Sequence, residues 1–169
     1  MKEVILLAII IGCSMIAKIK SDVIKRRYEN LKQILFFLNG VKIDVEVKNA
    51  SIIQVLKNAR GSIGTYTKKV AALIEQRPEM TMNEAARRAD AEDILCQKLC
   101  LSGEDKAEFL EYLLSLTVAD KEAIGQNTLI YRQSMVKKME YMEKEELKKV
   151  KVIRSMGVLC GLVIAILIF

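Results

Sequence analysis

Apolar residues gather in two runs at the ends of the sequence and recur at helical spacing between them. The first run extends from Met1 through Ala17, and the second, from Ser155 to Phe169, contains no charged residue and no proline. A spanning helix needs about 20 mostly apolar residues, so each run is long enough when a few neighbouring residues are added. We therefore predict transmembrane helices at residues 1–19 and 153–169.

The segment between the two runs has the pattern of amphipathic helices. From Leu31 to Val45, apolar residues recur at steps of one, three and four, which places them on one helix face. Residues 41–47 also alternate in the manner of a strand, but a lone strand has no partner in this chain. We therefore predict a helix there as well.

Local signals give expected starts and stops for the shorter helices. Ser51 with Gln54 and Thr81 with Glu84 have the spacing of capping boxes, in which two side chains satisfy free N–H groups at a helix start. The expected stops are Gly61, Gln76 or Arg77 ahead of Pro78, and Ser102–Gly103.

A long charged helix is expected from about Asp120 into the second apolar run, because no strong breaker occurs before Gly157. Its length calls for another long helix beside it, most simply the first one in the chain. The fold class is thus all-α: an antiparallel helical bundle of about six helices over residues 20–152, flanked by N- and C-terminal transmembrane helices.

Basic residues flank the inner side of both apolar runs. Because cytoplasmic flanks of membrane spans are enriched in Lys and Arg, both spans favour a cytoplasmic location for residues 20–152. The residues on which this orientation depends are Lys18, Lys20, Lys25, Arg26 and Arg27 after the first run, and Lys148, Lys149, Lys151 and Arg154 before the second.

The first run has two other interpretations besides a membrane anchor. It could be a cleaved signal peptide, or a lipoprotein signal, since Ile10–Cys13 resembles a lipobox with processing at Cys13. No small-x-small cleavage site followed by a polar stretch is evident, and the apolar run continues past the cysteine. An anchor is the interpretation we favour.

Composition and motifs argue against an enzyme. The 169 residues include no His, and the net charge of +6 arises from bases interleaved with acids, which is not the footprint of a nucleic-acid protein. Cys96 and Cys100 lack further zinc ligands, and the Gly61–Thr65 segment lacks the lysine of a phosphate loop. The carboxylate pairs Glu92–Asp93 and Glu145–Glu146 are typical of solvated helix faces. We predict no catalytic residue, metal or cofactor.

The sequence resembles stage III sporulation protein AB of endospore-forming bacteria over essentially its whole length. The most specific match is Arg154–Leu162, of sequence RSMGVLCGL. Weaker matches are Leu31–Leu38, Thr81–Ala86 and Asp120–Gln126 leading into Ile130. The sequence departs from the family pattern at Thr117–Ala119 and Lys48–Ala50, where the family has glycine.

This resemblance implies a helical fold similar to the cytoplasmic domain of type II secretion F platform proteins. It also implies a place in the mother-cell membrane facing the forespore, in a channel complex with other stage III sporulation membrane proteins. The implied cytoplasmic partner is the secretion-type motor ATPase of that complex, stage III sporulation protein AA. A homo-oligomer and a coiled-coil interaction remain open.

A structural helical scaffold of the membrane, with no ATPase partner, is the alternative function. Gly157 and Gly161 form a Gly-x-x-x-Gly pattern in the second apolar run, which favours close packing against another transmembrane helix. Small residues are also frequent in any span, so this packing face stays an expectation.

Overall fold

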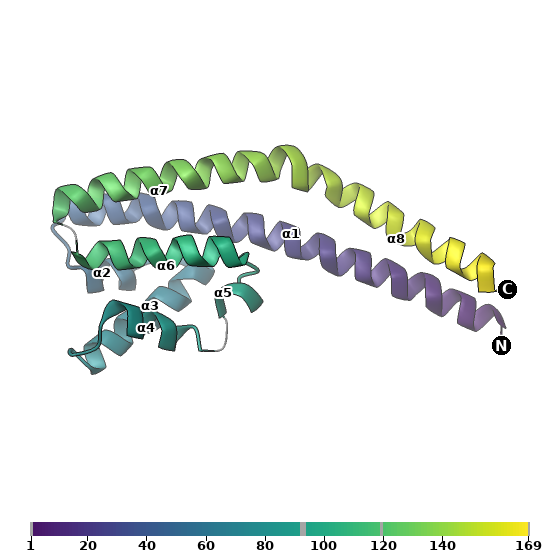
Figure 1. The fold of residues 1–169 in the computed structure, drawn as a ribbon, viewed down its shortest axis with the longest axis horizontal. Helices are drawn as coiled ribbons and strands as arrows, with labels where there is room; N and C mark the ends of the chain where they lie inside the picture. Colours follow the sequence, from purple (N-terminus) through teal and green to yellow (C-terminus); the bar gives the residue numbers. More distant parts are fainter. Residues whose placement is uncertain (1, 92–93, 119, 169) are drawn as a thin grey trace. The chain divides into compact units, whose positions relative to one another are not determined.

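The computed structural model describes residues 2–91, 94–118 and 120–168, without the side chains of residues 2–6, 118 and 168. All regular structure in these residues is helical, so the predicted all-α class is confirmed (Figure 1). The helices are α1 Lys2–Glu46, α2 Ile52–Asn58, α3 Gly61–Gln76, α4 Met82–Ala89, α5 Ile94–Gln97, α6 Gly103–Val118, α7 Lys121–Tyr141, the π-helical turn η1 Met142–Glu146 and α8 Leu147–Ile168.

The chain divides into two compact units, which we call the helix pair and the bundle. The helix pair consists of Met1–Arg26 and Glu140–Phe169, and the bundle consists of Arg27–Met139. The predicted domain boundaries, at residues 19/20 and 152/153, concern the membrane and stay a prediction.

Helix α6 is the central element of the bundle. Its Phe109 is fully buried. The Phe109 ring lies edge-on to the Phe37 ring of α1, with ring centroids 6.3 Å apart, and its centroid lies 6.1 Å from that of the Tyr66 ring in α3. On the neighbouring turn, Tyr112 stacks on Tyr131 of α7 at 4.8 Å. Burial of large aromatic rings contributes strongly to core stability, so these contacts tie four helices together.

Within the bundle, α7 runs antiparallel to the second half of α1, as expected. The guanidinium Nε of Arg132 donates a hydrogen bond to Asn39 Oδ1 (3.0 Å), and Lys121 Nζ donates to Asn49 Oδ1 (2.6 Å). Rising numbers along α1 and the turn that follows it therefore meet falling numbers on α7. Helix α1 continues through residues 41–45 to Glu46, which confirms the helix interpretation over the strand alternative.

Both predicted capping boxes are present. Ser51 Oγ accepts from the Gln54 N–H while Gln54 Oε1 accepts from the Ser51 N–H, and Thr81 with Glu84 does the same at α4. Helix α3 stops at Gln76, as expected ahead of Pro78.

The expectation that Gly61 ends a helix is wrong. Helix α2 already ends at Asn58, and Gly61 is instead the first residue of α3, with φ of +74°. A side chain at this position would also collide with the Gln33 carboxamide, whose Oε1 accepts from the Ser62 N–H at 2.7 Å. The glycine is needed because the backbone turns sharply against α1 at this point.

The long C-terminal helix is continuous as expected, but it contains one π-helical turn at Met142–Glu146 that the sequence did not predict. The departure from the family pattern at Thr117–Ala119 lies at the end of α6, which is Val118. Ala119 lies outside the described residues.

Candidate functional site

The two helices of the helix pair approach each other closely at two glycines of α8. A Cβ added to Gly157 would collide with the Ala17 Cβ and lie 3.1 Å from the Cys13 carbonyl oxygen. A Cβ added to Gly161 would lie 3.0 Å from the Ile10 Cα and 3.3 Å from the Cys13 Cβ. The helix backbones can thus pack at this distance because α8 has no side chain there.

Polar contacts hold the other end of the helix pair. Ser21 is fully buried; its hydroxyl donates to the Ala17 carbonyl at 2.9 Å and lies 3.4 Å from the Val150 carbonyl. One turn further along α8, Arg154 donates to the Asp22 carboxylate at 2.9 Å. These contacts and the glycines define an antiparallel register between α1 and α8.

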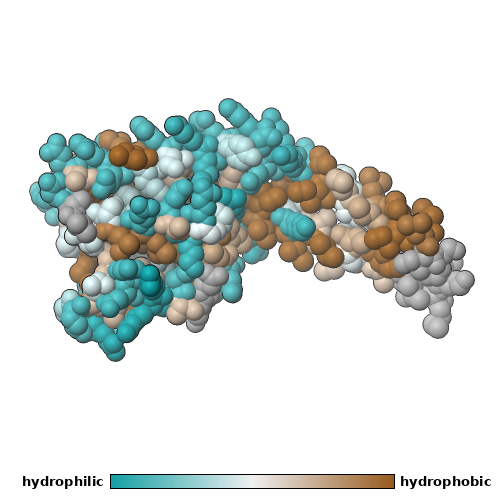
Figure 2. Space-filling view, in the orientation of Figure 1, coloured by the Kyte–Doolittle hydropathy of each residue, from teal (hydrophilic) through white to brown (hydrophobic). Residues whose placement is uncertain are grey.

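Large apolar side chains point outward from the helix pair. Figure 2 shows apolar side chains over much of this unit and mostly hydrophilic ones over the bundle. In α8 the exposed residues include Leu159, Val163, Ile166 and Leu167. Among the described residues one helical stretch, Lys121–Leu167, contains a window apolar and long enough to cross a membrane by length and composition, with a mean hydropathy of 2.1.

The basic residues that predict the orientation fall into two groups. Most are exposed on the helix pair, where Arg154 pairs with Asp22 and Lys149 lies 3.6 Å from Glu145. Arg27 is different, because it belongs to the bundle and its Nε donates to Asp105 Oδ2 at 2.7 Å. Besides any effect on orientation, Arg27 therefore has a structural role in the bundle.

Asp105 is the centre of a buried charge cluster that the sequence analysis missed. Its carboxylate is fully buried between Arg27 and Lys138, whose Nζ lies 2.9 Å from Oδ1. Lys138 also donates to Glu108 at 3.1 Å. Burial alone would raise the pKa of Asp105, but the two cations and hydrogen bonds from Ser102 outweigh it and hold the pKa at about 2.

A sequence signal for part of this cluster exists. Ser102 and Asp105 have the spacing of a capping box, and the structure forms it: the Ser102 N–H donates to Asp105 Oδ2 and the Asp105 N–H donates to Ser102 Oγ, both at 3.1 Å. The aspartate at the third position replaces the usual Glu or Gln. Its pairing with Arg27 and Lys138 joins positions 78 and 33 residues away, which spacing cannot show.

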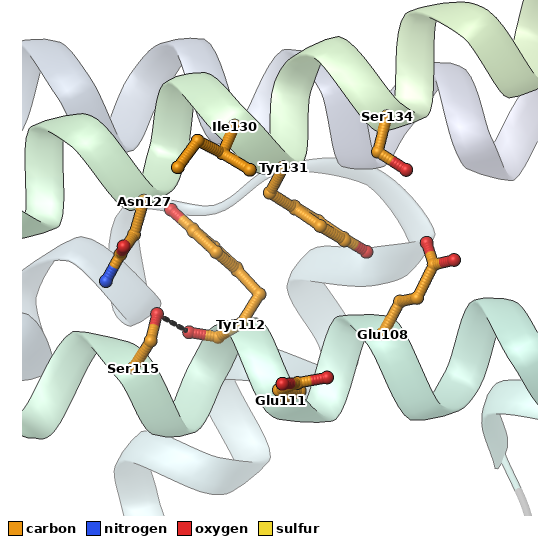
Figure 3. Close-up of a pocket in the computed structure, with 8 residues that line it drawn as sticks. All are labelled: Glu108, Glu111, Tyr112, Ser115, Asn127, Ile130, Tyr131 and Ser134. Atoms are coloured by element: carbon orange, nitrogen blue, oxygen red, sulfur yellow. Dashed lines mark hydrogen bonds between the residues drawn. The ribbon is translucent and has the colours of Figure 1, made fainter.

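A shallow groove of about 250 Å³ lies beside this cluster, between α6 and α7 (Figure 3). The stacked rings of Tyr112 and Tyr131 form its floor, and Glu108 and Glu111 line one part of it. Burial raises the pKa of Tyr112 to about 12 and raises that of Tyr131 further, so both phenols stay protonated near neutral pH. The groove therefore presents two protonated phenols beside two glutamate side chains.

The described residues contain no group of three or more His, Cys, Asp or Glu side chains that could hold a metal ion. The Glu145–Glu146 pair lies in the π-helical turn, with Glu145 near Lys149. The pair Glu92–Asp93 lies outside the described residues.

A family model described as stage III sporulation protein AB matches residues 2–169. The chain belongs to this family. Comparison with curated proteins and with solved structures gives no match.

Membership of the stage III sporulation protein AB family places the chain among sporulation proteins, and the description of this family names no catalytic activity. The predicted likeness to type II secretion F platform proteins stays a prediction, because no solved structure matches. In this family member the glycines of the most specific matching segment, Gly157 and Gly161, are the ones that contact α1.

Proposed function

We propose that the protein is a non-enzymatic membrane platform of a sporulation-specific channel complex between mother cell and forespore. In this role it couples a cytoplasmic motor ATPase to the membrane assembly. The observation that carries the proposal is the division of the chain into an apolar helix pair and a charged bundle with an aromatic core.

The helix pair is the membrane anchor in this proposal. Its outward-facing Leu, Ile and Val side chains suit a hydrocarbon environment, and its glycines allow the close backbone packing that drives helix association in lipid. The exposed lysines and arginines of the pair lie in the two segments nearest the bundle in sequence, which supports a cytoplasmic bundle and a location in the mother-cell membrane facing the forespore.

The bundle is the docking element for the motor ATPase, stage III sporulation protein AA, and for other stage III sporulation membrane proteins. A platform transmits work by making different contacts with its partners in two states and needs no catalytic residue. The interleaved acidic and basic residues on the outer faces of α6 and α7 suit a reversible protein contact. The rigid core around Phe109 keeps those faces in fixed positions.

A flotation experiment tests the partner. The full chain is reconstituted in liposomes and mixed with the purified motor ATPase, and co-flotation and ATP turnover are measured. We expect the ATPase to float with liposomes that carry the native chain and to change its turnover. Liposomes carrying the Asp105→Asn chain, with a destabilised bundle on an intact helix pair, are the matched control and should retain less ATPase. An ATPase that stays in the soluble fraction with the native chain would favour a plain structural scaffold instead.

A labelling experiment tests the orientation. A cysteine introduced by Lys121→Cys, in a chain whose native cysteines are replaced by Ala, is exposed to a membrane-impermeant thiol reagent in intact cells. We expect protection in intact cells and labelling after lysis. Labelling of intact cells would overturn the cytoplasmic location of the bundle. Lipid attachment at Cys13 is tested separately by inhibiting lipoprotein signal peptidase, which should leave gel mobility unchanged.

A further inference from the structure

Within the described part of the chain, buried polar atoms without a hydrogen-bond partner are concentrated at the groove between α6 and α7. These side-chain atoms are Asp105 Oδ1, Glu108 Oε2 and Tyr131 Oη. Asp105 Oδ1 still has Lys138 Nζ at 2.9 Å, whereas Glu108 meets this cation only through its other oxygen. Glu108 Oε2 and the Tyr131 hydroxyl therefore have hydrogen-bonding capacity that no described residue uses.

The Tyr131 hydroxyl points into the groove. Its side chain is only 9 % exposed, and Figure 3 shows the hydroxyl extending from α7 toward the Glu108 carboxylate on α6. A buried hydroxyl without a hydrogen bond lowers the stability of a fold, and phenylalanine would fill the same space without this cost. A ligand in the groove that hydrogen-bonds to the hydroxyl would remove the cost.

The groove also has an excess of negative charge. Glu111 follows Glu108 by three residues on α6, so both carboxylates lie on one helix face, where like charges repel each other. The two cations of the charge cluster already pair with Asp105, and one of them, Lys138, also pairs with Glu108. Glu111 forms no ion pair with a described residue. Three carboxylates thus share two cations, and a further cation in the groove would balance them.

A guanidinium group fits these features. It is a planar cation with N–H donors on several sides, so it can donate to Glu108 Oε2 and to the Tyr131 hydroxyl at once. Its plane stacks on aromatic faces, and the stacked rings of Tyr112 and Tyr131 form the floor of the groove. Ile130, 67 % exposed at the rim, offers apolar surface to the methylene stem of an arginine. The volume of about 250 Å³ far exceeds the roughly 30 Å³ that one water molecule occupies in the liquid, so the groove admits a side chain.

We propose that the groove binds the side chain of an arginine carried by a partner protein. The groove is shallow and would cover only part of a free ligand, whereas sites for small molecules enclose most of theirs. A partner segment would add contacts along the outer faces of α6 and α7 and so raise the effective concentration of its arginine at the groove. The proposal adds a recognition site to the platform function and does not rest on the ATPase.

A minimal probe tests the chemistry of the groove. The full chain in detergent carries isotope-labelled isoleucine methyl groups, and nuclear magnetic resonance at low salt follows the Ile130 signal, assigned by its loss in the Ile130→Val chain. N-acetylarginine amide should shift this signal in a saturable manner. N-acetylcitrulline amide has nearly the same shape but no charge and should bind several-fold more weakly. Equal shifts with the two probes would overturn the proposal.

Tyr131→Phe separates binding from structure. Loss of the hydroxyl should weaken binding of the arginine amide several-fold and should raise the melting temperature of the bundle, because no described residue bonds to this hydroxyl. Tyr141→Phe removes the hydroxyl of an exposed tyrosine at the end of α7 and should change neither quantity. A lower melting temperature with Tyr131→Phe would show that the hydroxyl bonds within the chain and would contradict the proposal.

Glu111→Gln tests the contribution of charge. Glu111 is exposed, so the substitution should leave the bundle folded and weaken binding of the arginine amide several-fold. Glu104→Gln removes an exposed carboxylate of α6 that does not line the groove, and it should leave binding unchanged. Equal effects of the two substitutions would assign the binding to the overall charge of α6 and would count against a site in the groove.

Photo-cross-linking in sporulating cells tests the source of the arginine. Benzoylphenylalanine is introduced at Ile130 of the full chain, and mass spectrometry locates the attachment. We expect a segment of another protein with an arginine at or next to the attached residue. Glu111→Arg should abolish the cross-link, and reversal of that partner arginine to glutamate should restore it.

Two results of the cross-linking would overturn the assignment to a partner arginine: attachment to no protein, or attachment to a segment without arginine. An arginine segment from a protein other than the motor ATPase, with rescue by the reversed charges, would support the site in the groove. The same result would count against the ATPase as the partner in the platform function.

Discussion

The helix pair and the bundle are built from parts of the same long helices, yet they are stabilised in opposite ways. The helix pair exposes its large apolar residues and packs through small ones, with Gly157 and Gly161 against Cys13 and Ala17. The bundle buries large rings around Phe109 and neutralises the buried carboxylate of Asp105 with two cations. Side-chain pattern, not helix length, therefore decides which surroundings each part suits.

This contrast has an energetic reason. In water, burial of apolar area is the main favourable term, so a water-exposed bundle needs a thick core and tolerates a buried charge only when it is paired. In lipid, the tails are as apolar as leucine, and helices associate through close packing. The strongest test of the contrast is to remove one stabilising contact from each unit and to measure which unit loses stability.

The largest effect is expected from Asp105→Asn. It leaves the partly buried Arg27 and Lys138 without their common buried anion, which should cost about 3 kcal/mol of bundle stability. The chain has no Trp, so near-ultraviolet circular dichroism of the buried tyrosines reports bundle unfolding in detergent. Glu104→Gln removes the exposed carboxylate next in sequence and should change stability by less than about 0.5 kcal/mol. Equal effects of the two substitutions would show that the cluster is not a stabilising feature.

Lowering the pH should remove the stabilising contribution of the same charge cluster in the native chain. The pKa of Asp105 is about 2 in the folded bundle, below its ordinary value of 3.8. A carboxyl group whose pKa is lower in the folded chain than in the unfolded chain stabilises the fold at pH values above the unfolded-state pKa. This contribution is lost as the pH falls through the folded-state pKa. Tyrosine circular dichroism should therefore show the Asp105 contribution disappearing between about pH 4 and pH 2. In the Asp105→Asn chain this component should be absent, and its persistence there would assign acid unfolding to other carboxylates.

Gly157→Ala should affect only the helix pair. The new Cβ collides with Ala17, so α1 and α8 must separate. Cys13 and Cys160 line the same hollow between them, and oxidation of the native chain in liposomes should join them in a disulfide detectable by peptide mass spectrometry. We expect Gly157→Ala to reduce the yield several-fold and to leave the tyrosine signal of the bundle unchanged.

The matched control for this prediction is Gly12→Ala, which also replaces a glycine of the helix pair. A Cβ at Gly12 would meet no atom within 4 Å, so the disulfide yield should not change. If Gly12→Ala and Gly157→Ala behave alike, close packing at Gly157 does not determine the register of the pair.

The fold was predictable from the sequence where local signals decide it. The apolar spacing of α1, the capping boxes at Ser51 and Thr81 and the stop ahead of Pro78 all depend on neighbours within four residues. Gly61 was misassigned because a glycine between two short helices can end one or begin the next. The close approach of Gln33, 28 residues away in sequence, is a contact that local spacing cannot show.

The candidate sites depend on contacts between distant residues and were less predictable. The glycine pattern of α8 was visible, but its contact with Cys13 and Ala17 required the antiparallel register of the pair. The charge cluster joins Arg27, Asp105 and Lys138 from three helices. In its own segment, each of these residues has the pattern of an ordinary solvated charge. The π-helical turn at Met142–Glu146 has no sequence signature that we can identify.

The smallest expected effect concerns a local device of the bundle, the capping box at α4. Thr81→Ala removes the oxygen that accepts from the Glu84 N–H and should cost about 1 kcal/mol, measured as a shift of the tyrosine melting curve in detergent. Thr65→Ala, exposed within α3, is the control and should be neutral or stabilise by a few tenths of a kcal/mol.

Because α4 packs on α3 and α6, the lost cap should lower the melting temperature of the whole bundle while the Cys13–Cys160 disulfide yield stays the same. A fall in that yield would mean that the helix pair and the bundle unfold together. The two units would then differ in how their side chains pack but would not be independent in stability.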